Sequence, residues 1–161
     1  MTRWGIGPRW ALSSIAFAAP TIAARVVWPD LFSIPHVPRT LVVAFGVALL
    51  AIGIPFFAAA ARTLHRGFAA GELFTRGPYG LCRHPIYGSW IFFNVPGIVL
   101  VSDSWIGLLV PPVMYLALRV LVRKEEAWLE TRFGDAYRAY RARTPFACPL
   151  LGFFHRARRD R

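Results

Sequence analysis

The feature that most constrains this chain is an uncharged apolar run from Thr40 to Ala61. A helix over this run would be roughly 33 Å long, close to the hydrocarbon thickness of about 30 Å in a bilayer. Backbone polar groups must be paired inside lipid, so an α-helix is the expected conformation. The run therefore predicts a transmembrane helix, kinked at Pro55, with Gly46 and Gly53 as small packing positions.

Three other apolar segments approach membrane-spanning length, namely Trp10–Trp28, Ile86–Val101 and Trp105–Val122. The last two are separated by Ser102-Asp103-Ser104 alone, which predicts an antiparallel helical hairpin. With 56% hydrophobic residues and a mean hydropathy of +0.45, the 161-residue chain is too apolar for an ordinary soluble domain. We therefore predict an all-α, multi-pass integral membrane protein with about four transmembrane helices.

The first apolar segment carries the features of a membrane anchor. Trp10 and Trp28 stand at its two ends, where interfacial aromatic rings collect. Arg25 lies close enough to the end to extend toward lipid headgroups, an interpretation that we favour over a place in a substrate path.

The net charge of +11 is concentrated on one predicted side of the membrane. Basic residues stand at or just after the ends of the second and fourth apolar segments, at Arg62, His65, Arg66, Arg119, Arg123 and Lys124. The positive-inside rule places these residues, both termini and the polar loop after residue 70 in the cytoplasm.

Composition also excludes several classes of partner. Arginine-rich chains can bind nucleic acid, but the apolar runs favour membrane lipids, and we expect no nucleic acid. Cys82 and Cys148 have no Cys-x-x-Cys spacing, so neither a disulfide framework nor a metal site is expected.

One polar, turn-rich stretch, Gly77 to Tyr87, stands between apolar runs. Its two prolines fix φ and favour extended geometry in the residue before each, which shapes the loop. Within it, Arg83 brings a fork of hydrogen-bond donors, His84 a titratable imidazole, and Tyr79 and Tyr87 aromatic faces with hydroxyls. This combination favours a binding or catalytic site.

A second polar stretch, Glu125 to Tyr140, follows the last apolar segment. It predicts a helix over Glu125–Phe133 that ends at Gly134, and then a short helix, capped by Asp135, that carries two tyrosines. The pair is typical of a lid over a site.

The ordered string Gly-Pro-Tyr … Arg-His-Pro-x-Tyr, followed by Glu-Glu … Phe-Gly … Tyr-x-x-Tyr, resembles the isoprenylcysteine carboxyl methyltransferase and phospholipid methyltransferase group of integral membrane enzymes. The resemblance covers about residues 70 to 150, and implies S-adenosylmethionine as methyl donor, with S-adenosylhomocysteine as product. It implies one membrane-embedded domain with anchor helices over about 10–62, a catalytic core over about 70–150 and a basic tail over 151–161. Family members usually follow the tyrosines with a basic residue and Ile-Pro, whereas this chain has Thr144-Pro145-Phe146, which leaves the acceptor open.

The donor presents opposite charges, a ribose and an adenine, so its pocket needs carboxylates, cations and aromatic rings together. From the two motifs we expect the cofactor-binding residues to be Tyr79, Arg83, His84, Pro85, Tyr87, Glu125, Glu126, Tyr137 and Tyr140. Arg83 and His84 are the candidate catalytic residues, with His84 as base if the acceptor is an amine.

A lipophilic or lipidated acceptor would enter between helices and meet the donor at the cytoplasmic face. Candidate residues for its pocket are Trp90, Phe93, Asn94 and Tyr115, which also serve as helix-packing residues. Two other functions fit parts of the sequence: an NADPH-dependent membrane sterol-type reductase, which can share the Arg-His-Pro-x-Tyr pattern, and a non-enzymatic lipid-binding scaffold. The oligomeric state stays open.

Overall fold

The computed structural model describes residues 5–70 and 72–153, and over these the chain is helical, without strands. The all-α prediction is therefore confirmed for the described residues. The elements, in chain order, are α1 (Gly7–Val27), α2 (Pro29–Phe32), α3 (Arg39–Ala70), α4 (Pro78–Leu81), α5 (Pro85–Ser89), the π-helical turn η1 (Trp90–Asn94), α6 (Val95–Val101), the 3₁₀ turn η2 (Ile106–Leu109), α7 (Val110–Leu121) and α8 (Arg123–Arg143). The basic tail lies mostly outside the described residues, from 154 onward.

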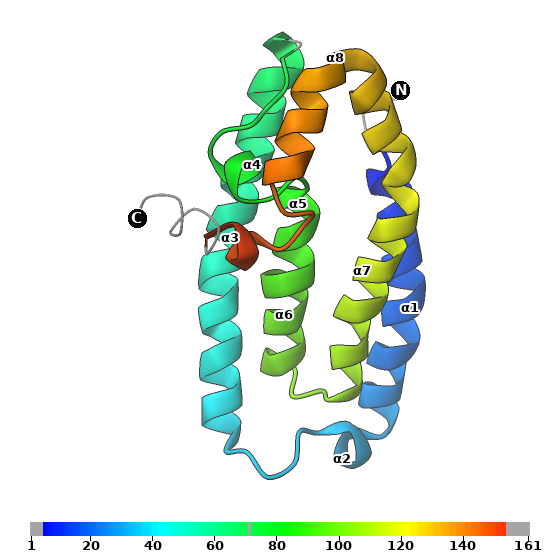
Figure 1. The fold of residues 1–161 in the computed structure, drawn as a ribbon. Helices are drawn as coiled ribbons and strands as arrows, with labels where there is room; N and C mark the ends of the chain where they lie inside the picture. The colour runs from blue at the N-terminus through cyan, green and yellow to red at the C-terminus, as the bar shows by residue number, and fades with distance from the viewer. Residues whose placement is uncertain (1–4, 71, 154–161) are drawn as a thin grey trace.

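The long helices pack as two pairs (Figure 1): α3 lies against α6, and α1 lies against α7. Glycines allow the close approach of α3 and α6, because a Cβ at Gly53 would lie 2.3 Å from Asn94 Oδ1 and one at Gly46 would lie 2.9 Å from the Gly97 carbonyl oxygen. The predicted packing role of Gly46 and Gly53 is thus confirmed. In the other pair, the Trp10 indole Nε1 donates to the Met114 carbonyl at 3.0 Å.

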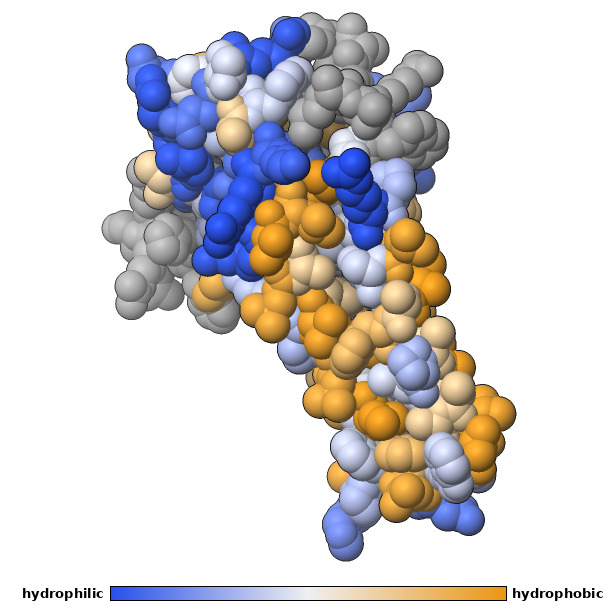
Figure 2. Space-filling view, turned by 90° about the vertical axis from the view of Figure 1, so that its right-hand side faces the viewer, coloured by the Kyte–Doolittle hydropathy of each residue, from blue (hydrophilic) through white to orange (hydrophobic). Residues whose placement is uncertain are grey.

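Within residues 5–70 and 72–153, two helices are long and apolar enough to cross a membrane, α1 and the Arg39–Arg66 part of α3. The η2–α7 segment and α8 are joined at a bend of 43° and would form a third span if they are counted together. The apolar helical segment Pro85–Val101 is shorter than these candidates. Figure 2 shows hydrophobic surface along the bundle and hydrophilic surface gathered at the end that holds α8. The chain is an integral membrane protein, and the count of four spans stays a prediction.

Two expectations for α1 were wrong. Trp10 is not an interfacial ring but a core residue, 6% exposed, because Met114 offers its indole an acceptor. Arg25 does not extend toward headgroups: its Nε donates to the Asp103 carbonyl at 2.9 Å, and its guanidinium pairs with the Asp103 carboxylate at 4.0 Å. Both partners lie more than 70 residues away in the chain.

The predicted break after Phe133 is present in α8. Gly134 has φ 51° and ψ −126°, a conformation that glycine adopts without strain from a Cβ. The break lets the second half of α8, with Tyr137 and Tyr140, fold back toward the loop that precedes α5 (Figure 1).

Candidate functional site

The backbone of the Arg-His-Pro loop is held by the C-terminal segment. The Arg83 amide donates to the Pro145 carbonyl at 2.9 Å, and the His84 amide donates to the Phe146 carbonyl at 3.1 Å. His84 then precedes α5, where Pro85 occupies the first helical position, as proline prefers. These contacts fix the positions from which both side chains extend.

Glu126 joins the two motifs. Its Oε1 accepts hydrogen bonds from Arg83 Nη1 and from His84 Nε2, the latter at 3.0 Å. Burial acts to raise the pKa of the Glu126 carboxyl, but the hydrogen bond from His84 and the charge of Arg83 outweigh it, so the pKa lies below its usual value. An ionised Glu126 therefore orients both candidate catalytic side chains.

Glu125 faces another surface of the site. Burial raises the pKa of its carboxyl, while the charge of His84 and a backbone hydrogen bond from Ile6 oppose the rise. A Cβ at Gly5 would lie 3.2 Å from Glu125 Oε2, so the segment before α1 also forms part of the site. The sequence analysis missed this segment, because no side chain in it carries a chemical signal.

The tyrosines bring α8 and the loop together. Tyr140 donates its hydroxyl to the Tyr79 carbonyl at 2.7 Å, and Tyr137 is 1% exposed beside it. Burial, with the nearby Glu126 carboxylate, raises the pKa of Tyr137 to about 12, so this residue stays a neutral hydroxyl. Tyr87 packs edge-on against Trp10, with ring centroids 5.0 Å apart, and its ring centroid lies 6.3 Å from that of His84.

Three buried polar atoms of this cluster find no hydrogen-bond partner among the described residues: Arg83 Nε, Glu125 Oε2 and Tyr137 Oη. A buried polar group left unpaired costs about 1–3 kcal/mol, so three in one cluster indicate a binding site for a polar ligand. The donor Arg83 Nε, the acceptor Glu125 Oε2 and the Tyr137 hydroxyl together suit a ligand that carries a negative charge, a positive charge and hydroxyl groups.

Phe146 is the central aromatic residue of the site, and sequence analysis did not single it out as a site residue. Its ring lies 5.1 Å from that of His84 and 5.9 Å from that of Tyr115, and the guanidinium of Arg119 sits 4.8 Å from its centroid. It belongs to the stretch where this chain departs from the family pattern.

The structure does not bring the four candidate acceptor residues together. Phe93 packs on Phe56 of α3, and Asn94 faces Gly53, so both serve the contact between α3 and η1. Tyr115 packs edge-to-face against Phe92 and Phe146, whereas Trp90 lines a groove.

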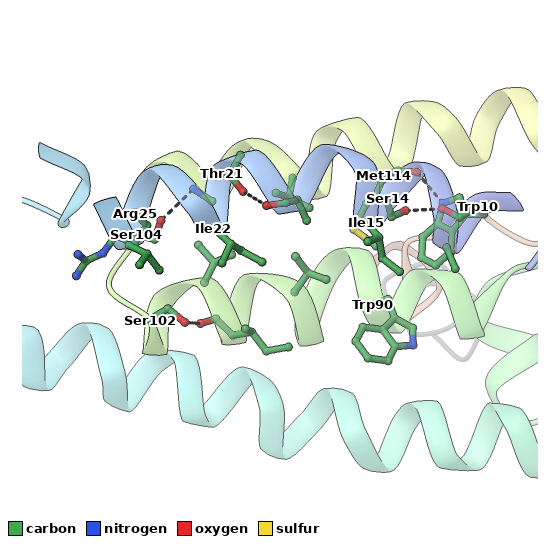
Figure 3. A pocket seen from close by; sticks show the side chains of 18 of the residues that line it. Trp10, Ser14, Ile15, Thr21, Ile22, Arg25, Trp90, Ser102, Ser104 and Met114 are labelled. Carbon is green, nitrogen blue, oxygen red and sulfur yellow. Dashed lines mark hydrogen bonds between the residues drawn. The ribbon is translucent and has the colours of Figure 1, made fainter. Parts of the chain in front are cut away.

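This groove lies between the two helix pairs and has a volume of about 860 Å³ (Figure 3). Its wall is formed by α1, α6 and α7, with Trp10, Trp90 and Met114 at the end near the site. Trp10 also contacts Tyr87, so one aromatic pair separates the groove from the polar cluster.

Residues 41–136, more than half of the chain, match the Phospholipid methyltransferase family. The chain belongs to this family. The matched region contains the Arg-His-Pro loop and both glutamates, which confirms the resemblance seen in the sequence and does not favour the reductase alternative.

Relatives with two kinds of name are similar to the chain: O-methyltransferases and a metal resistance protein. The chain is 27% identical to the protein-S-isoprenylcysteine O-methyltransferase of Mus musculus over 133 residues, which are 79% of this chain and 46% of that protein. The Schizosaccharomyces pombe protein of the same name is 32% identical over 79 residues, 49% of this chain and 34% of the relative. A cobalt-zinc-cadmium resistance protein of Cupriavidus metallidurans is 34% identical over 86 residues, 51% of this chain and 38% of that protein. The chain thus spans about half the length, or less, of these relatives, and no solved structure matches it.

Proposed function

We propose that this protein transfers a methyl group from S-adenosylmethionine to a lipophilic or membrane-associated acceptor, at the cytoplasmic face of the membrane. The observation that carries the proposal is the buried cluster in which Glu126 holds Arg83 and His84, while three polar atoms have no hydrogen-bond partner in the part of the chain that the structure describes. Family membership supports the reaction class.

The two glutamates take different parts in this proposal. Glu126 already accepts from Arg83 and His84, so it positions those side chains. Glu125 Oε2 is buried and has no hydrogen-bond partner among the described residues, which makes Glu125 the candidate ligand for the ammonium or the ribose hydroxyls of the cofactor. Arg83, whose Nε likewise has no partner among those residues, is the candidate partner for the cofactor carboxylate.

When bound, S-adenosylmethionine supplies an electrophilic methyl group on a sulfonium. Its sulfide leaving group is neutral and needs no acid, so the protein's contribution is orientation and the exclusion of water. The rings of Phe146 and Tyr87 lie beside the His84 imidazole, and Trp10 packs on Tyr87, which supports that exclusion. A base is required only if the acceptor is an amine, in which case His84 is the candidate.

The acceptor is proposed to be an isoprenylcysteine-type carboxylate or another lipid or thiol. The groove supports an acceptor that carries a hydrocarbon chain, because the groove lies beside the site. The hydroxyl groups of Ser14 and Thr21 in its lining already donate hydrogen bonds to backbone carbonyls. Ser14 and Thr21 donate to carbonyls of their own helix at 2.7 Å each, so the lining behaves as apolar surface. The names of the mammalian and yeast relatives agree with this class.

Calorimetric titration of the purified protein with S-adenosylhomocysteine tests the proposal without a known acceptor. We expect saturable binding that weakens at least about tenfold in Glu125→Gln, because a charged partner of the ammonium is lost. The matched control is Glu130→Gln on the same helix, whose carboxylate pairs with Arg138 and Arg141 outside the site.

Loss of binding in Glu125→Gln but not in Glu130→Gln supports the assignment. Absence of binding by the folded wild-type protein contradicts it. Stabilisation by NADPH in place of S-adenosylhomocysteine would establish the reductase.

A further inference from the structure

The end of the groove far from the site is polar, in contrast to the rest of its lining. Arg25 of α1 and Ser102 and Ser104 of the α6–η2 turn gather there (Figure 3). The Ser102 hydroxyl donates to the Ile98 carbonyl at 2.8 Å, and Ser104 Oγ accepts from the Gly107 amide at 3.3 Å. The guanidinium of Arg25 is therefore the charged group that a ligand in the groove would meet at this end.

Three segments hold Arg25 in place. Its Nε bonds to the Asp103 carbonyl, and its guanidinium lies 4.0 Å from the Asp103 carboxylate. Asp103 in turn accepts from the Ile34 amide at 3.1 Å, and the Trp105 indole donates to the Leu31 carbonyl at 3.0 Å. The charged end is thus built from α1, the α6–η2 turn and the segment around α2, and it is not a mobile surface side chain.

The distance between the two ends follows from α1. Trp10 and Arg25 both line the groove and lie fifteen residues apart in one helix, which corresponds to roughly 22 Å. The side chains of the ion pair keep some contact with solvent, 22% exposed for Arg25 and 15% for Asp103. Hydrocarbon that reaches Arg25 must remove that remaining solvent. Desolvation of a charge without a new partner is unfavourable, so chain growth beyond this point should weaken binding.

We propose that the Arg25–Asp103 pair is a polar stop that limits the length of the hydrocarbon chain the groove accepts. The inference rests on the proposed function, since the chain belongs to the methyl acceptor. It assigns chain-length specificity to a residue at the opposite end of the bundle from the reacting groups.

The test measures binding of N-acetylcysteine thioethers with geranyl, farnesyl and geranylgeranyl chains, or longer prenyl chains, by calorimetry with S-adenosylhomocysteine at saturation. In the wild-type protein, affinity should rise with chain length and then fall at least about tenfold at the first chain that reaches Arg25. A hydroxyl at the far end of that chain should restore affinity, because it can form a hydrogen bond with the polar groups at that end of the groove. This comparison uses the wild-type protein alone.

Two variants then locate the limit. Arg25→Met replaces the cation with an apolar side chain of similar reach and should move the limit by at least one isoprene unit. Arg25→Lys keeps a cation and should leave the limit in place. An affinity that rises without limit in the wild type, or a limit unchanged in folded Arg25→Met, overturns the proposal.

The outcomes separate this inference from the proposed function. Binding of S-adenosylhomocysteine with no chain limit overturns the polar stop alone. A chain limit that moves in Arg25→Met, in a protein that does not bind S-adenosylhomocysteine, supports the stop and overturns the methyltransferase. No chain binding at all, with cofactor bound, overturns the stop and the hydrocarbon acceptor together.

Discussion

Two adjacent residues, Glu125 and Glu126, have opposite electrostatic environments. Neighbouring positions on an α-helix point about 100° apart, so one carboxylate faces Arg83 and His84 while the other faces Ile6 and the start of α1. The pKa of Glu126 is lowered by its cationic partners, and that of Glu125 is raised by burial. A doubled glutamate in the sequence therefore represents two separate tasks.

Binding of S-adenosylhomocysteine should depend on pH through Glu125. The protonated amino group of S-adenosylhomocysteine favours an ionised Glu125 carboxylate. Protonation of Glu125 should therefore weaken binding as the pH falls. Because burial raises the pKa of the Glu125 carboxyl, the loss should begin at a higher pH than for an ordinary carboxyl, with a slope approaching tenfold per pH unit. Glu126 stays ionised in this window, since its pKa is lowered.

Calorimetry across pH checks this expectation. Glu125→Gln should bind weakly with a flat profile from acidic to neutral pH, and Glu130→Gln should follow the wild type. A wild-type affinity that stays constant as the pH is lowered from neutral to acidic would contradict the role of Glu125.

At the scale of the elements, local patterns predicted what depends on local physics. The apolar run at Thr40–Ala61 lies within α3, the glycine after Phe133 breaks α8, and the paired motifs meet through Glu126. Trp10, Arg25 and Phe146 could not be placed in this way, because their positions depend on partners far away in the chain. The sequence predicted positions near the membrane interface for Trp10 and Arg25. Their tertiary contacts instead bury Trp10 in the core and pair Arg25 with Asp103.

The α3–α6 contact should be sensitive to the size of the residue at position 53. Gly53→Val puts side-chain atoms where Asn94 and Phe93 already lie, the nearest at 2.3 Å from the Cβ position. Overpacking typically costs about 1–3 kcal/mol, so the melting temperature in detergent should fall by several degrees. The control is Ala48→Val on an exposed position of α3, which should change little. Equal melting temperatures for both variants would show that the two helices do not pack this closely.

At the scale of the whole molecule, one end of the bundle holds the chemistry. The start of α1, the loop before α5 and both halves of α8 meet there (Figure 1), and hydrophilic surface covers it (Figure 2). The opposite end holds α2, the turn at Asp103 and the polar end of the groove. In the proposed function, a water-soluble donor and a hydrocarbon acceptor would thus approach the site from different phases, which would account for placing such a reaction in a membrane.

The proposed orientation puts the site end in the cytoplasm, and cysteine labelling with a membrane-impermeant maleimide tests it. Cys148→Ser serves as background, because Cys82 is fully buried and that burial raises the pKa of its thiol, which keeps it unreactive. In intact cells, Val37→Cys in the α2–α3 linker should be labelled, whereas Asp135→Cys in α8, whose native side chain is 96% exposed, should not. Inverted vesicles should give the reverse.

The basic residues at the end of α3 and after α7 favour this orientation. Each basic residue near the cytoplasmic surface is expected to contribute about one kilocalorie per mole of attraction to anionic lipid. Labelling of both positions from the same side would contradict a bundle that crosses the bilayer between them, and reversed labelling would place the site outside.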